Sequence, residues 1–233
     1  MAFKGVILDV DGTLVLSNDV HAQAWVETFA KFGYQVKYEE VRPLIGMGGD
    51  QIIPKFAPGL SDSEGKGKEI TDYRKQLVLD KFVPQMSPAN GAREMVLKLQ
   101  EQGKQLVIAT SASSKVLTSL LKVAKVDDIL SQDEATSSND AENSKPSPDI
   151  IKVALEKFEM QPNEIVMIGD TPYDIEAANK AGVEVIAVRS GGFDDAQLKN
   201  ASRGASSPGL IAIYNDAADL VENYDHSPLA RGE

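Results

Sequence analysis

Two carboxylates follow a short apolar segment near the N-terminus of this 233-residue chain. Residues 3–8 read Phe-Lys-Gly-Val-Ile-Leu, and Asp9 and Asp11 come next with one residue between them. A short apolar run of this kind is typical of a buried parallel strand. Because open α/β sheets bind ligands outside the carboxyl ends of their strands, we expect Asp9 at the mouth of a sheet. Gly12 would let the chain turn sharply after Asp11.

A second acidic pair follows a similar apolar segment later in the chain. Residues 166–169 read Val-Met-Ile-Gly, Asp170 follows directly, and Asp174 comes four residues later. If the two strands are neighbours, Asp170 lies beside Asp9, and three carboxylates converge in a dry cleft. Like charges in such a cleft repel, so a hard divalent cation is the natural neutraliser, and oxygen-only ligands favour Mg²⁺. Asp174 has a second explanation, because with Thr171 it forms a capping-box pattern at a helix N-terminus, and it can serve both purposes.

Hydroxyl groups and a lysine occupy two further places where an anion could bind. Thr110 and Ser111 follow an apolar segment and precede an expected helix, so their hydroxyls and the free backbone amides suit a phosphate group. The same residues would also serve as ordinary helix caps. Lys145 lies in a segment with two nearby prolines, and a fixed ammonium group there could neutralise a phosphate or a carboxylate. A solvated surface position is the alternative, since most lysines are exposed.

The elements that must position these residues divide the chain into two parts. Residues 16–84 carry only helical patterns, whereas the residues after them alternate between strand and helix patterns. A change of this kind marks a candidate domain boundary. We therefore predict an α/β domain from residues 1–15 and 85–233, with a doubly wound, mostly parallel sheet of the Rossmann-like type and right-handed crossovers. Residues 16–84 would form an inserted all-helical domain.

The expected elements follow from the spacing of apolar residues and from capping signals. His21 and Trp25 share one helical face, and Gly33 would end that helix in a left-handed conformation. Ser61 and Glu64 form a capping-box pattern that predicts the start of another helix. We expect helices over residues 18–31, 38–47, 50–56, 61–82, 89–102, 113–123, 148–158, 172–181, 195–200 and 216–221. We expect strands over residues 3–8, 105–109, 129–131, 164–168, 183–188 and 210–213, and a loose tail over residues 224–233.

Composition excludes several classes of function. The chain carries 35 acidic and 24 basic residues and a net charge of −11, which argues against nonspecific nucleic-acid binding because that requires a basic face. The absence of cysteine excludes disulfides, thiolate metal sites and a cysteine nucleophile, and two histidines cannot build a multi-histidine metal site. No apolar run approaches the roughly 20 residues that span a bilayer, and no signal-peptide pattern precedes the first strand. We therefore expect a cytoplasmic enzyme without membrane or nucleic-acid partners.

Four segments of the chain resemble the motifs of the haloacid dehalogenase-like (HAD) hydrolase superfamily and occur in the same order. They read Asp-Val-Asp-Gly-Thr-Leu at 9–14, Val-Ile-Ala-Thr-Ser at 107–111, Ser-Lys-Pro-Ser-Pro-Asp at 144–149 and Val-Met-Ile-Gly-Asp-Thr-Pro-Tyr-Asp at 166–174. Their ordered conjunction is far more specific than any one of them. The resemblance extends over essentially the whole chain.

The resemblance implies a role for each matching residue. Asp9 would be the nucleophile that attacks phosphorus and becomes an aspartyl phosphate. Asp11 would be the general acid/base, which protonates the leaving oxygen and then activates water. Thr110, with Ser111 beside it, would bind the transferring phosphoryl group, and Lys145 would stabilise its charge.

The resemblance also implies a magnesium site. Asp9, the backbone carbonyl of Asp11 and Asp170 would bind Mg²⁺, and Asp174 would support the site. Asp11 also distinguishes phosphoryl transfer from dehalogenation. The dehalogenase branch lacks an acid/base carboxylate at that place, because a halide leaves without a proton.

The helical insert resembles the C1-type cap of the phosphoglycolate phosphatase-like and β-phosphoglucomutase-like branches. Such a cap would close over the site, exclude water and select the substrate. His21 matches a cap histidine of the β-phosphoglucomutase-like pattern, where it helps couple cap closure to the acid/base. A plain helix-surface histidine is the alternative. Gly48 and Gly49 would form a flexible substrate loop, or only a helix stop.

The sequence therefore predicts a Mg²⁺-dependent phosphatase that hydrolyses a small phosphorylated metabolite and exists as a monomer or a homodimer. One alternative is a β-phosphoglucomutase-like phosphosugar mutase. Mutases carry an arginine in the glycine-containing cap loop, whereas here Arg42 precedes the glycines, which favours a phosphatase. The other alternative is a non-catalytic regulatory or binding protein of the same family. Such a protein would be expected to have lost one of the site residues, and all of them are present.

Overall fold

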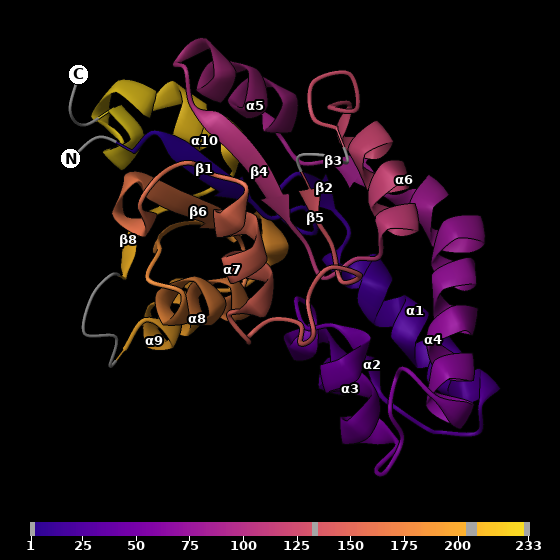
Figure 1. The fold of residues 1–233 in the computed structure, drawn as a ribbon. Coiled ribbons are helices and arrows are strands. Elements are labelled where there is room, and N and C mark those ends of the chain that lie inside the picture. The colour runs from indigo at the N-terminus through magenta and orange to yellow at the C-terminus, as the bar shows by residue number, and fades with distance from the viewer. Residues whose placement is uncertain (1–2, 132–134, 204–208, 231–233) are drawn as a thin grey trace.

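The computed structural model describes residues 3–131, 135–203 and 209–230, and its centre is a six-stranded parallel sheet (Figure 1). The strand order is β5–β4–β1–β6–β7–β8, and every neighbouring pair runs parallel. The strands span Gly5–Leu8 (β1), Gln105–Ala109 (β4), Ala135–Thr136 (β5), Ile165–Gly169 (β6), Glu184–Val188 (β7) and Leu210–Tyr214 (β8). The first strand lies in the middle, and the strand order reverses beside it, which is the switch point of a doubly wound sheet.

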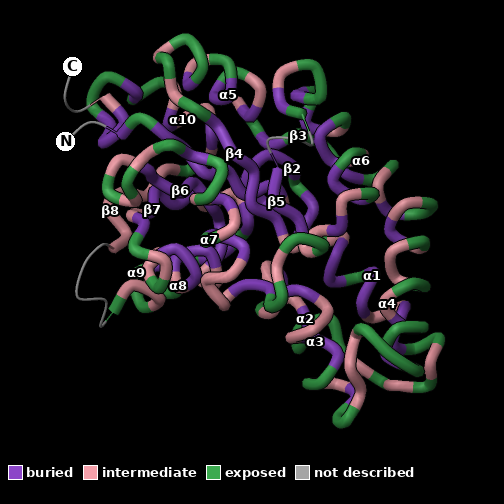
Figure 2. Tube along the Cα trace, in the orientation of Figure 1, coloured by how far each residue is buried: buried purple, intermediate pink, exposed green. Residues whose placement is uncertain are grey.

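Helices cover both faces of this sheet. One face carries α7 (Asp149–Glu156), α8 (Pro172–Lys180) and α9 (Asp195–Ala201), and the other carries α5 (Ala92–Glu101), α6 (Ser114–Ala124) and α10 (Ala217–Glu222). Val6 and Leu8 of β1 pack in the cluster with α5, whereas Ile7 packs in the cluster with α7. This alternation is the two-residue period of a strand that is buried on both faces. The central strands of the sheet are buried along most of their length (Figure 2). The predicted doubly wound α/β fold is confirmed.

The carboxyl ends of three central strands lie side by side. Leu8 of β1 pairs with Ile108 of β4 on one side and with Ile168 of β6 on the other. The residues that follow these strands therefore meet at one edge of the sheet, which is where an open α/β sheet binds its ligands.

An all-helical segment leaves the sheet after β1 and returns before α5 (Figure 1). It contains α1 (Asn18–Lys31), α2 (Tyr38–Val41), α3 (Gly49–Phe56) and α4 (Gly65–Leu77), with 3₁₀ turns at Arg42–Leu44 and Val83–Gln85 and a π-helical turn at Val78–Phe82. A short antiparallel ribbon, β2 (Val15–Leu16) with β3 (Ser87–Pro88), joins the outgoing and returning crossings. The helices share a hydrophobic cluster of their own, in which Trp25 and Phe29 stack with ring centroids 5.3 Å apart. In the part of the chain that the structure describes, no helix has both the length and the apolar character needed to cross a membrane.

Two predicted elements are wrong because of local turns. The helix predicted over residues 38–47 ends at Val41 and continues as a 3₁₀ turn. Pro43 has no backbone N–H for an α-helical hydrogen bond, so the chain tightens there. The strand predicted over residues 129–131 is instead a turn that is hydrogen-bonded back toward the end of α6, and the edge strand β5 follows later in the chain.

The start of α4 and the C-terminal tail also differ from the prediction. The helix predicted from Ser61 begins at Gly65, because the Ser61 hydroxyl is hydrogen-bonded to the hydroxyl and the amide of Ser63. Of the predicted loose tail over residues 224–233, the described part forms two 3₁₀ turns. Leu229 is fully buried in the cluster that contains α5, so apolar packing holds this part in place. The last three residues of the predicted tail lie outside the described residues.

Candidate active site

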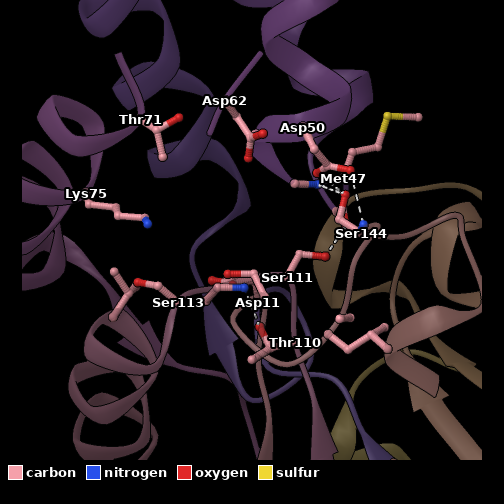
Figure 3. Close-up of a pocket in the computed structure, with 18 of the residues that line it drawn as sticks. Asp11, Met47, Asp50, Asp62, Thr71, Lys75, Thr110, Ser111, Ser113 and Ser144 are labelled. Carbon is pink, nitrogen blue, oxygen red and sulfur yellow. Dashed lines mark hydrogen bonds between the residues drawn. The ribbon is translucent and has the colours of Figure 1, made fainter. Parts of the chain in front are cut away.

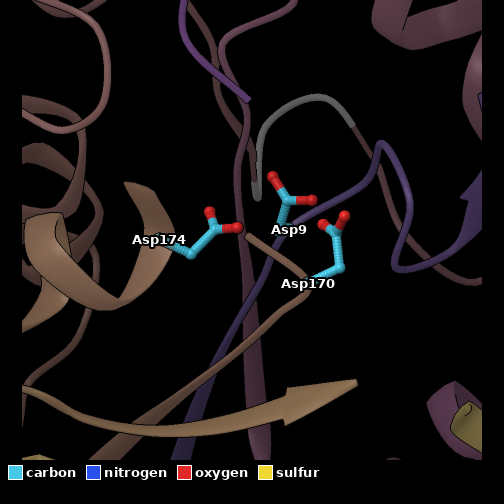
Figure 4. Close-up of side chains that lie close together, drawn as sticks. All are labelled: Asp9, Asp170 and Asp174. Carbon is cyan, nitrogen blue, oxygen red and sulfur yellow. The ribbon is translucent and has the colours of Figure 1, made fainter. Parts of the chain in front are cut away.

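Three carboxylates converge at the carboxyl edge of the sheet. Asp9 follows β1, Asp170 follows β6, and Asp174 lies in the first turn of α8. One oxygen atom of each carboxylate lies within 4.8 Å of the others, and all three residues are buried (Figure 4). The sequence placed Asp170 beside Asp9 on condition that their strands are neighbours, and the pairing of β1 with β6 meets that condition.

Lys145 places a positive charge inside this cluster. Its Nζ donates to Asp9 Oδ1 at 2.6 Å, to Asp174 Oδ1 at 2.7 Å and to the Ala109 carbonyl oxygen at 2.9 Å. These three acceptors match the three protons of an ammonium group. Only 1% of Lys145 is exposed, so the alternative of a solvated surface lysine is wrong.

Burial and neighbouring charges change the pKa values of the cluster. Burial raises the pKa of Asp9 to about 7, although Lys145 opposes this. Burial and the carboxylates of Asp9 and Asp174 hold the pKa of Asp170 well above its usual range. Burial alone would lower the pKa of Lys145, but the two carboxylates bound to it outweigh this and raise the pKa. Three carboxylates thus face one ammonium group, and this excess of negative oxygen ligands fits a hard divalent cation.

The Asp11 carboxylate lies at the cavity wall, outside the three-carboxylate cluster. Its Oδ1 accepts hydrogen bonds from the Ser17 hydroxyl at 2.6 Å and from His21 Nε2 at 2.8 Å. No donor among the described residues reaches its Oδ2. Burial would raise the pKa of Asp11, but His21, Ser17 and Arg74 outweigh this and lower the pKa. His21 is buried against Asp11, so the alternative of a plain surface histidine is wrong.

The two predicted phosphate-binding hydroxyls have different surroundings. Thr110 is buried directly after β4, and its hydroxyl accepts a hydrogen bond from the Ala112 amide at 3.1 Å. The Ser111 hydroxyl donates to the Gly46 carbonyl oxygen of the helical segment at 3.2 Å. Both residues line the cavity described below. Neither caps α6, whose N-cap residue is Ser113, so the simple capping explanation is wrong.

A cavity of about 360 Å³ lies between the sheet edge and the helical segment (Figure 3). The helical segment contributes Trp25, Asp50, Asp62, Thr71 and Lys75 to its walls, and the sheet side contributes Asp9, Asp11, Thr110, Ser111, Ser113 and Ser144. Gly48 and Gly49 also line the cavity, but they stand at the start of α3 and do not end a helix. Pockets of roughly 300–1,000 Å³ are typical of small-molecule sites.

Hydrogen bonds tie the start of α3 to the residue before Lys145. The Gly48 amide donates to the Ser144 hydroxyl at 2.9 Å. Asp50 accepts hydrogen bonds from both the hydroxyl and the amide of Ser144, the latter at 3.1 Å. Farther along the same interface, the Tyr173 hydroxyl donates to the Pro43 carbonyl oxygen at 2.6 Å. The helical segment is therefore fastened over the cavity in this structure.

Comparison with known proteins shows to which family the chain belongs. The sequence model of the haloacid dehalogenase-like hydrolase family matches residues 6–188, a range that includes all four motif segments. The chain belongs to the haloacid dehalogenase-like (HAD) hydrolase family. It is therefore an enzyme of the hydrolase class, as the sequence predicted.

Relatives of this HAD hydrolase include phosphatases. Pyrophosphatase PpaX of Bacillus cereus is 30% identical over 190 residues, which cover 81% of this chain and 84% of that protein. A hydrolase from Pseudomonas syringae has a similar structure, with a TM-score of 0.84 at 25% identity, covering 96% of this chain and 98% of that one. A protein from Bacteroides vulgatus that is assigned as a β-phosphoglucomutase has a TM-score of 0.83 at 25% identity, covering 99% of this chain and 91% of that one.

Two residues of the HAD site were not predicted to contact it. The Thr13 hydroxyl lies 3.2 Å from both Asp9 Oδ2 and Asp170 Oδ1 and can donate to either. Asn18 Nδ2 donates to Asp170 Oδ2 at 2.7 Å and to the Gly191 carbonyl oxygen at 3.0 Å. Thr13 belongs to the first motif, at residues 9–14, so its position in the sequence could have indicated that it contacts the site. Asn18 only begins the helix predicted over residues 18–31, and its contact with Asp170 depends on how α1 meets the sheet.

Proposed function

We propose that this HAD hydrolase is a Mg²⁺-dependent phosphatase that hydrolyses a small phosphorylated metabolite through an aspartyl phosphate on Asp9. One observation carries the proposal. Asp9 lines the cavity and is bound to the buried Lys145, and Asp11 lines the same cavity with one carboxylate oxygen free of hydrogen bonds from the described residues. A nucleophile and an acid/base therefore face a single space, and a fixed cation is bound to the nucleophile.

The residues of the chain can carry out a two-step reaction. A carboxylate oxygen of Asp9 attacks phosphorus, and the bond to the leaving oxygen breaks as protonated Asp11 gives that oxygen its proton. Ionised Asp11 then takes a proton from water, the water oxygen attacks phosphorus, and the bond to Asp9 breaks to release inorganic phosphate. Asp11 is ionised in the free protein because its pKa is lowered. A bound phosphate dianion beside it raises that pKa and favours the protonated form that the first step requires.

The remaining groups position and neutralise the phosphoryl group. Lys145 keeps its charge beside Asp9 through both steps. Asp9, Asp170 and the backbone carbonyl of Asp11 would hold Mg²⁺, and Asp174 would support them through its ion pair with Lys145. When bound, Mg²⁺ supplies further positive charge for the transferring phosphoryl group.

We assign residues 16–84 as a C1-type cap over a core of residues 1–15 and 85–233. Three observations support this division: the separate hydrophobic cluster of the helices, the β2–β3 ribbon at the crossings, and the cavity between the two parts. The cap covers the phosphate end of the site, so it would exclude water during the reaction. The volume of about 360 Å³ favours a small metabolite as the substrate.

The environment of Arg42 favours a phosphatase over a phosphosugar mutase. A mutase needs a cation in the cap for the second phosphate group of its bisphosphate intermediate. Arg42 is already bound to Asp19 and to the Gly191 carbonyl oxygen, each at 2.5 Å, and lies 5.6 Å from the ring centroid of Phe193. It does not line the cavity, and the loop glycines carry no side chain that could replace it, whereas the cap cations that do line the cavity, Arg74 and Lys75, lie on α4 and not in the glycine loop.

Phosphate release from a panel of substrates tests this function. The panel holds pyrophosphate, phosphoglycolate, sugar monophosphates and nucleoside monophosphates, each with Mg²⁺ and with EDTA. We expect release that requires Mg²⁺ and that falls by at least about a thousandfold in Asp9→Asn. Asp127→Asn, which changes an exposed carboxylate away from the cavity, is the matched control.

Two results would contradict the proposal. Release that persists in Asp9→Asn would exclude Asp9 as the nucleophile. Conversion of β-glucose 1-phosphate to glucose 6-phosphate with a bisphosphate primer, without release from the panel, would establish the mutase.

A further inference from the structure

The helical segment places four charged side chains on the cavity wall that faces the sheet edge, namely Asp50, Asp62, Arg74 and Lys75. Two of these side chains are already bound by neighbours. Each carboxylate oxygen of Asp50 accepts a hydrogen bond from Ser144. Arg74 Nη2 lies 3.1 Å from His21 Nδ1, and the guanidinium group stacks over Trp25 with Cζ 4.3 Å from the ring centroid. Of the four, Asp62 and Lys75 remain available to a molecule in the cavity.

Asp62 and Lys75 are unpaired charges of opposite sign. Both are half-buried, and both extend into the cavity on the side opposite Asp11 (Figure 3). Neither side chain forms an ion pair or a hydrogen bond with another residue of the described part of the chain. Burial first and then the Asp50 carboxylate raise the pKa of Asp62, and the opposing effect of Lys75 is smaller. The surroundings of Asp62 are therefore poor in positive charge.

These two groups set what a ligand between them must offer. A carboxylate only accepts hydrogen bonds, and an ammonium group only donates them. A hydroxyl group does both, so an uncharged alcohol with several hydroxyls can satisfy Asp62 and Lys75 together. A second anion, such as the carboxylate of phosphoglycolate or the second phosphate of pyrophosphate, would bind only Lys75. It would face Asp62 as a like charge and would leave that carboxylate without a donor.

We propose that Asp62 and Lys75 determine specificity by selecting a leaving group that is an uncharged alcohol with several hydroxyls. This inference rests on the proposed function, because it names the alcohol that leaves when Asp9 takes the phosphoryl group. Asp11, which would protonate the leaving oxygen, lines the same cavity. The part of the substrate beyond that oxygen would therefore extend toward the helical segment, where Asp62 accepts from one hydroxyl and Lys75 donates to another.

Three monophosphates with the same number of carbon atoms test this selection. Glucitol 6-phosphate carries a hydroxyl on every carbon that does not bear the phosphate. In 6-phosphogluconate a carboxylate replaces the terminal hydroxymethyl group, and hexyl phosphate has no hydroxyl at all. We expect kcat/KM of the wild type with Mg²⁺ to be about 10- to 100-fold higher for glucitol 6-phosphate than for either of the others, because a site that binds hydroxyls rejects analogues that lack them.

Variants of the two residues assign the preference to them. Asp62→Ala is expected to lower kcat/KM for glucitol 6-phosphate and to raise it for 6-phosphogluconate, so that their ratio falls by about 10- to 100-fold. Asp62→Asn keeps an acceptor without the charge, so it should retain most of the activity on glucitol 6-phosphate and still admit 6-phosphogluconate. Lys75→Met should lower kcat/KM for both of these substrates more than for hexyl phosphate. Asp72→Ala, at an exposed ion pair on α4, should leave every ratio unchanged.

Titration calorimetry with the Asp9→Asn variant measures the same selection without turnover. This variant keeps Asp62 and Lys75 but lacks the nucleophile, so the phosphates stay intact during the measurement. We expect glucitol 6-phosphate to bind more tightly than 6-phosphogluconate and hexyl phosphate. Adding Asp62→Ala to this variant should remove most of the difference between glucitol 6-phosphate and 6-phosphogluconate.

Several outcomes would overturn the inference. Equal kcat/KM for the three substrates in the wild type excludes the selection, and so does a loss in Asp62→Ala that is the same for all three, because a purely structural defect acts on every substrate alike. Hydrolysis of pyrophosphate or phosphoglycolate in preference to glucitol 6-phosphate would exclude it while leaving the proposed phosphatase in place. If the wild type hydrolyses no phosphate substrate, the proposed function fails, and the order of affinities still decides whether Asp62 selects the ligand.

Discussion

Lys145 holds two buried carboxylates together with a single ammonium group. Its three hydrogen bonds satisfy every proton that it carries, so the charge is tolerated where water is excluded. The carboxylates of Asp9 and Asp174 each accept one of these hydrogen bonds. At the scale of the residue, the charged groups of the site therefore depend on one another. Removing one of them leaves the others buried without an ion-pair partner, which costs their full desolvation free energy.

Lys145→Met is expected to lower the free energy of unfolding by about 3–5 kcal/mol near neutral pH, because it leaves buried carboxylates unpaired. Urea denaturation measures this change. Lys122→Met, which changes an exposed lysine on α6, should have an effect within about 0.5 kcal/mol. A loss of stability in Lys145→Met no larger than in this control would show that the buried ion pairs do not stabilise the fold.

The raised pKa of Asp9 predicts how Mg²⁺ affects stability at different pH values. Asp9 has a pKa of about 7 in the folded protein against 3.8 ordinarily, so between these values the folded state binds more protons than the unfolded state. The metal-free protein therefore loses stability as pH rises through this window. At the proposed site Mg²⁺ would bind the ionised carboxylates, so its stabilising effect should grow over the same window.

Thermal denaturation with and without Mg²⁺, at about pH 5.5 and about pH 8, checks this dependence. We expect the rise in Tm caused by Mg²⁺ to be larger at the higher pH. An equal rise at both values would mean that protons and Mg²⁺ do not compete for these carboxylates.

At the scale of the element, the N-terminus of α8 serves the helix and the site together. The Thr171 hydroxyl accepts a hydrogen bond from the Asp174 amide at 3.2 Å and donates to Asp174 Oδ2 at 2.6 Å. The same carboxylate binds Lys145 through its other oxygen. The capping box that the sequence predicted is present, and it orients a side chain of the carboxylate cluster.

Thr171→Ala is therefore expected to have two effects. It should lower the free energy of unfolding by about 1–2 kcal/mol through the lost cap. It should also weaken Mg²⁺ binding by about tenfold, because Asp174 loses a partner that orients it. Urea denaturation and titration calorimetry measure these changes separately.

Asp194→Ala offers a matched control for this substitution. Asp194 caps α9 in the same way, accepting from the Gln197 amide at 2.8 Å, but it has no contact with the carboxylate cluster. We expect a similar loss of stability and unchanged Mg²⁺ affinity. If both variants bind Mg²⁺ as the wild type does, Asp174 does not support the metal site.

At the scale of the whole molecule, the cavity depends on hydrogen bonds that hold the helical segment against the sheet edge. Asp50 and Ser144 form two of these hydrogen bonds, and Ser144 immediately precedes Lys145. Trp25, the single tryptophan of the sequence, lines the cavity and is 2% exposed in this closed arrangement. Its fluorescence can therefore report whether the two parts separate.

Asp50→Ala removes both hydrogen bonds that Asp50 accepts from Ser144, so the helical segment should spend more time away from the sheet. We expect stronger quenching of Trp25 fluorescence by acrylamide and a KM raised several-fold, on the order of 1 kcal/mol of lost closure energy. Asp72→Ala, at an exposed ion pair on α4, is the control for the loss of an acidic residue in the same segment. Quenching equal to that of the wild type would show that the Asp50 contact does not hold the cavity closed.

Local patterns in the sequence determined most of the elements and the approximate place of the site. The strand predicted over residues 105–109 is β4 itself, and the capping box of Thr171 and Asp174 begins α8 as expected. Such features depend on residues only a few positions apart, so they can be read from the chain directly. Where long-range packing competes with local signals, the prediction was wrong, as in the C-terminal tail that Leu229 anchors to the core.

Only the tertiary structure decided which ambiguous residues belong to the site. Lys145 and His21 each had an ordinary surface explanation, and no sequence signal distinguished Arg74 from a solvated charge on a helix. Lys145 reaches Asp9 across 136 positions of the chain, and Arg74 reaches His21 across 53. Burial, hydrogen-bond direction and pKa are properties of such distant contacts, because they depend on which segments exclude water from a group. A sequence pattern extends over a few residues and carries no information about which segment will cover it.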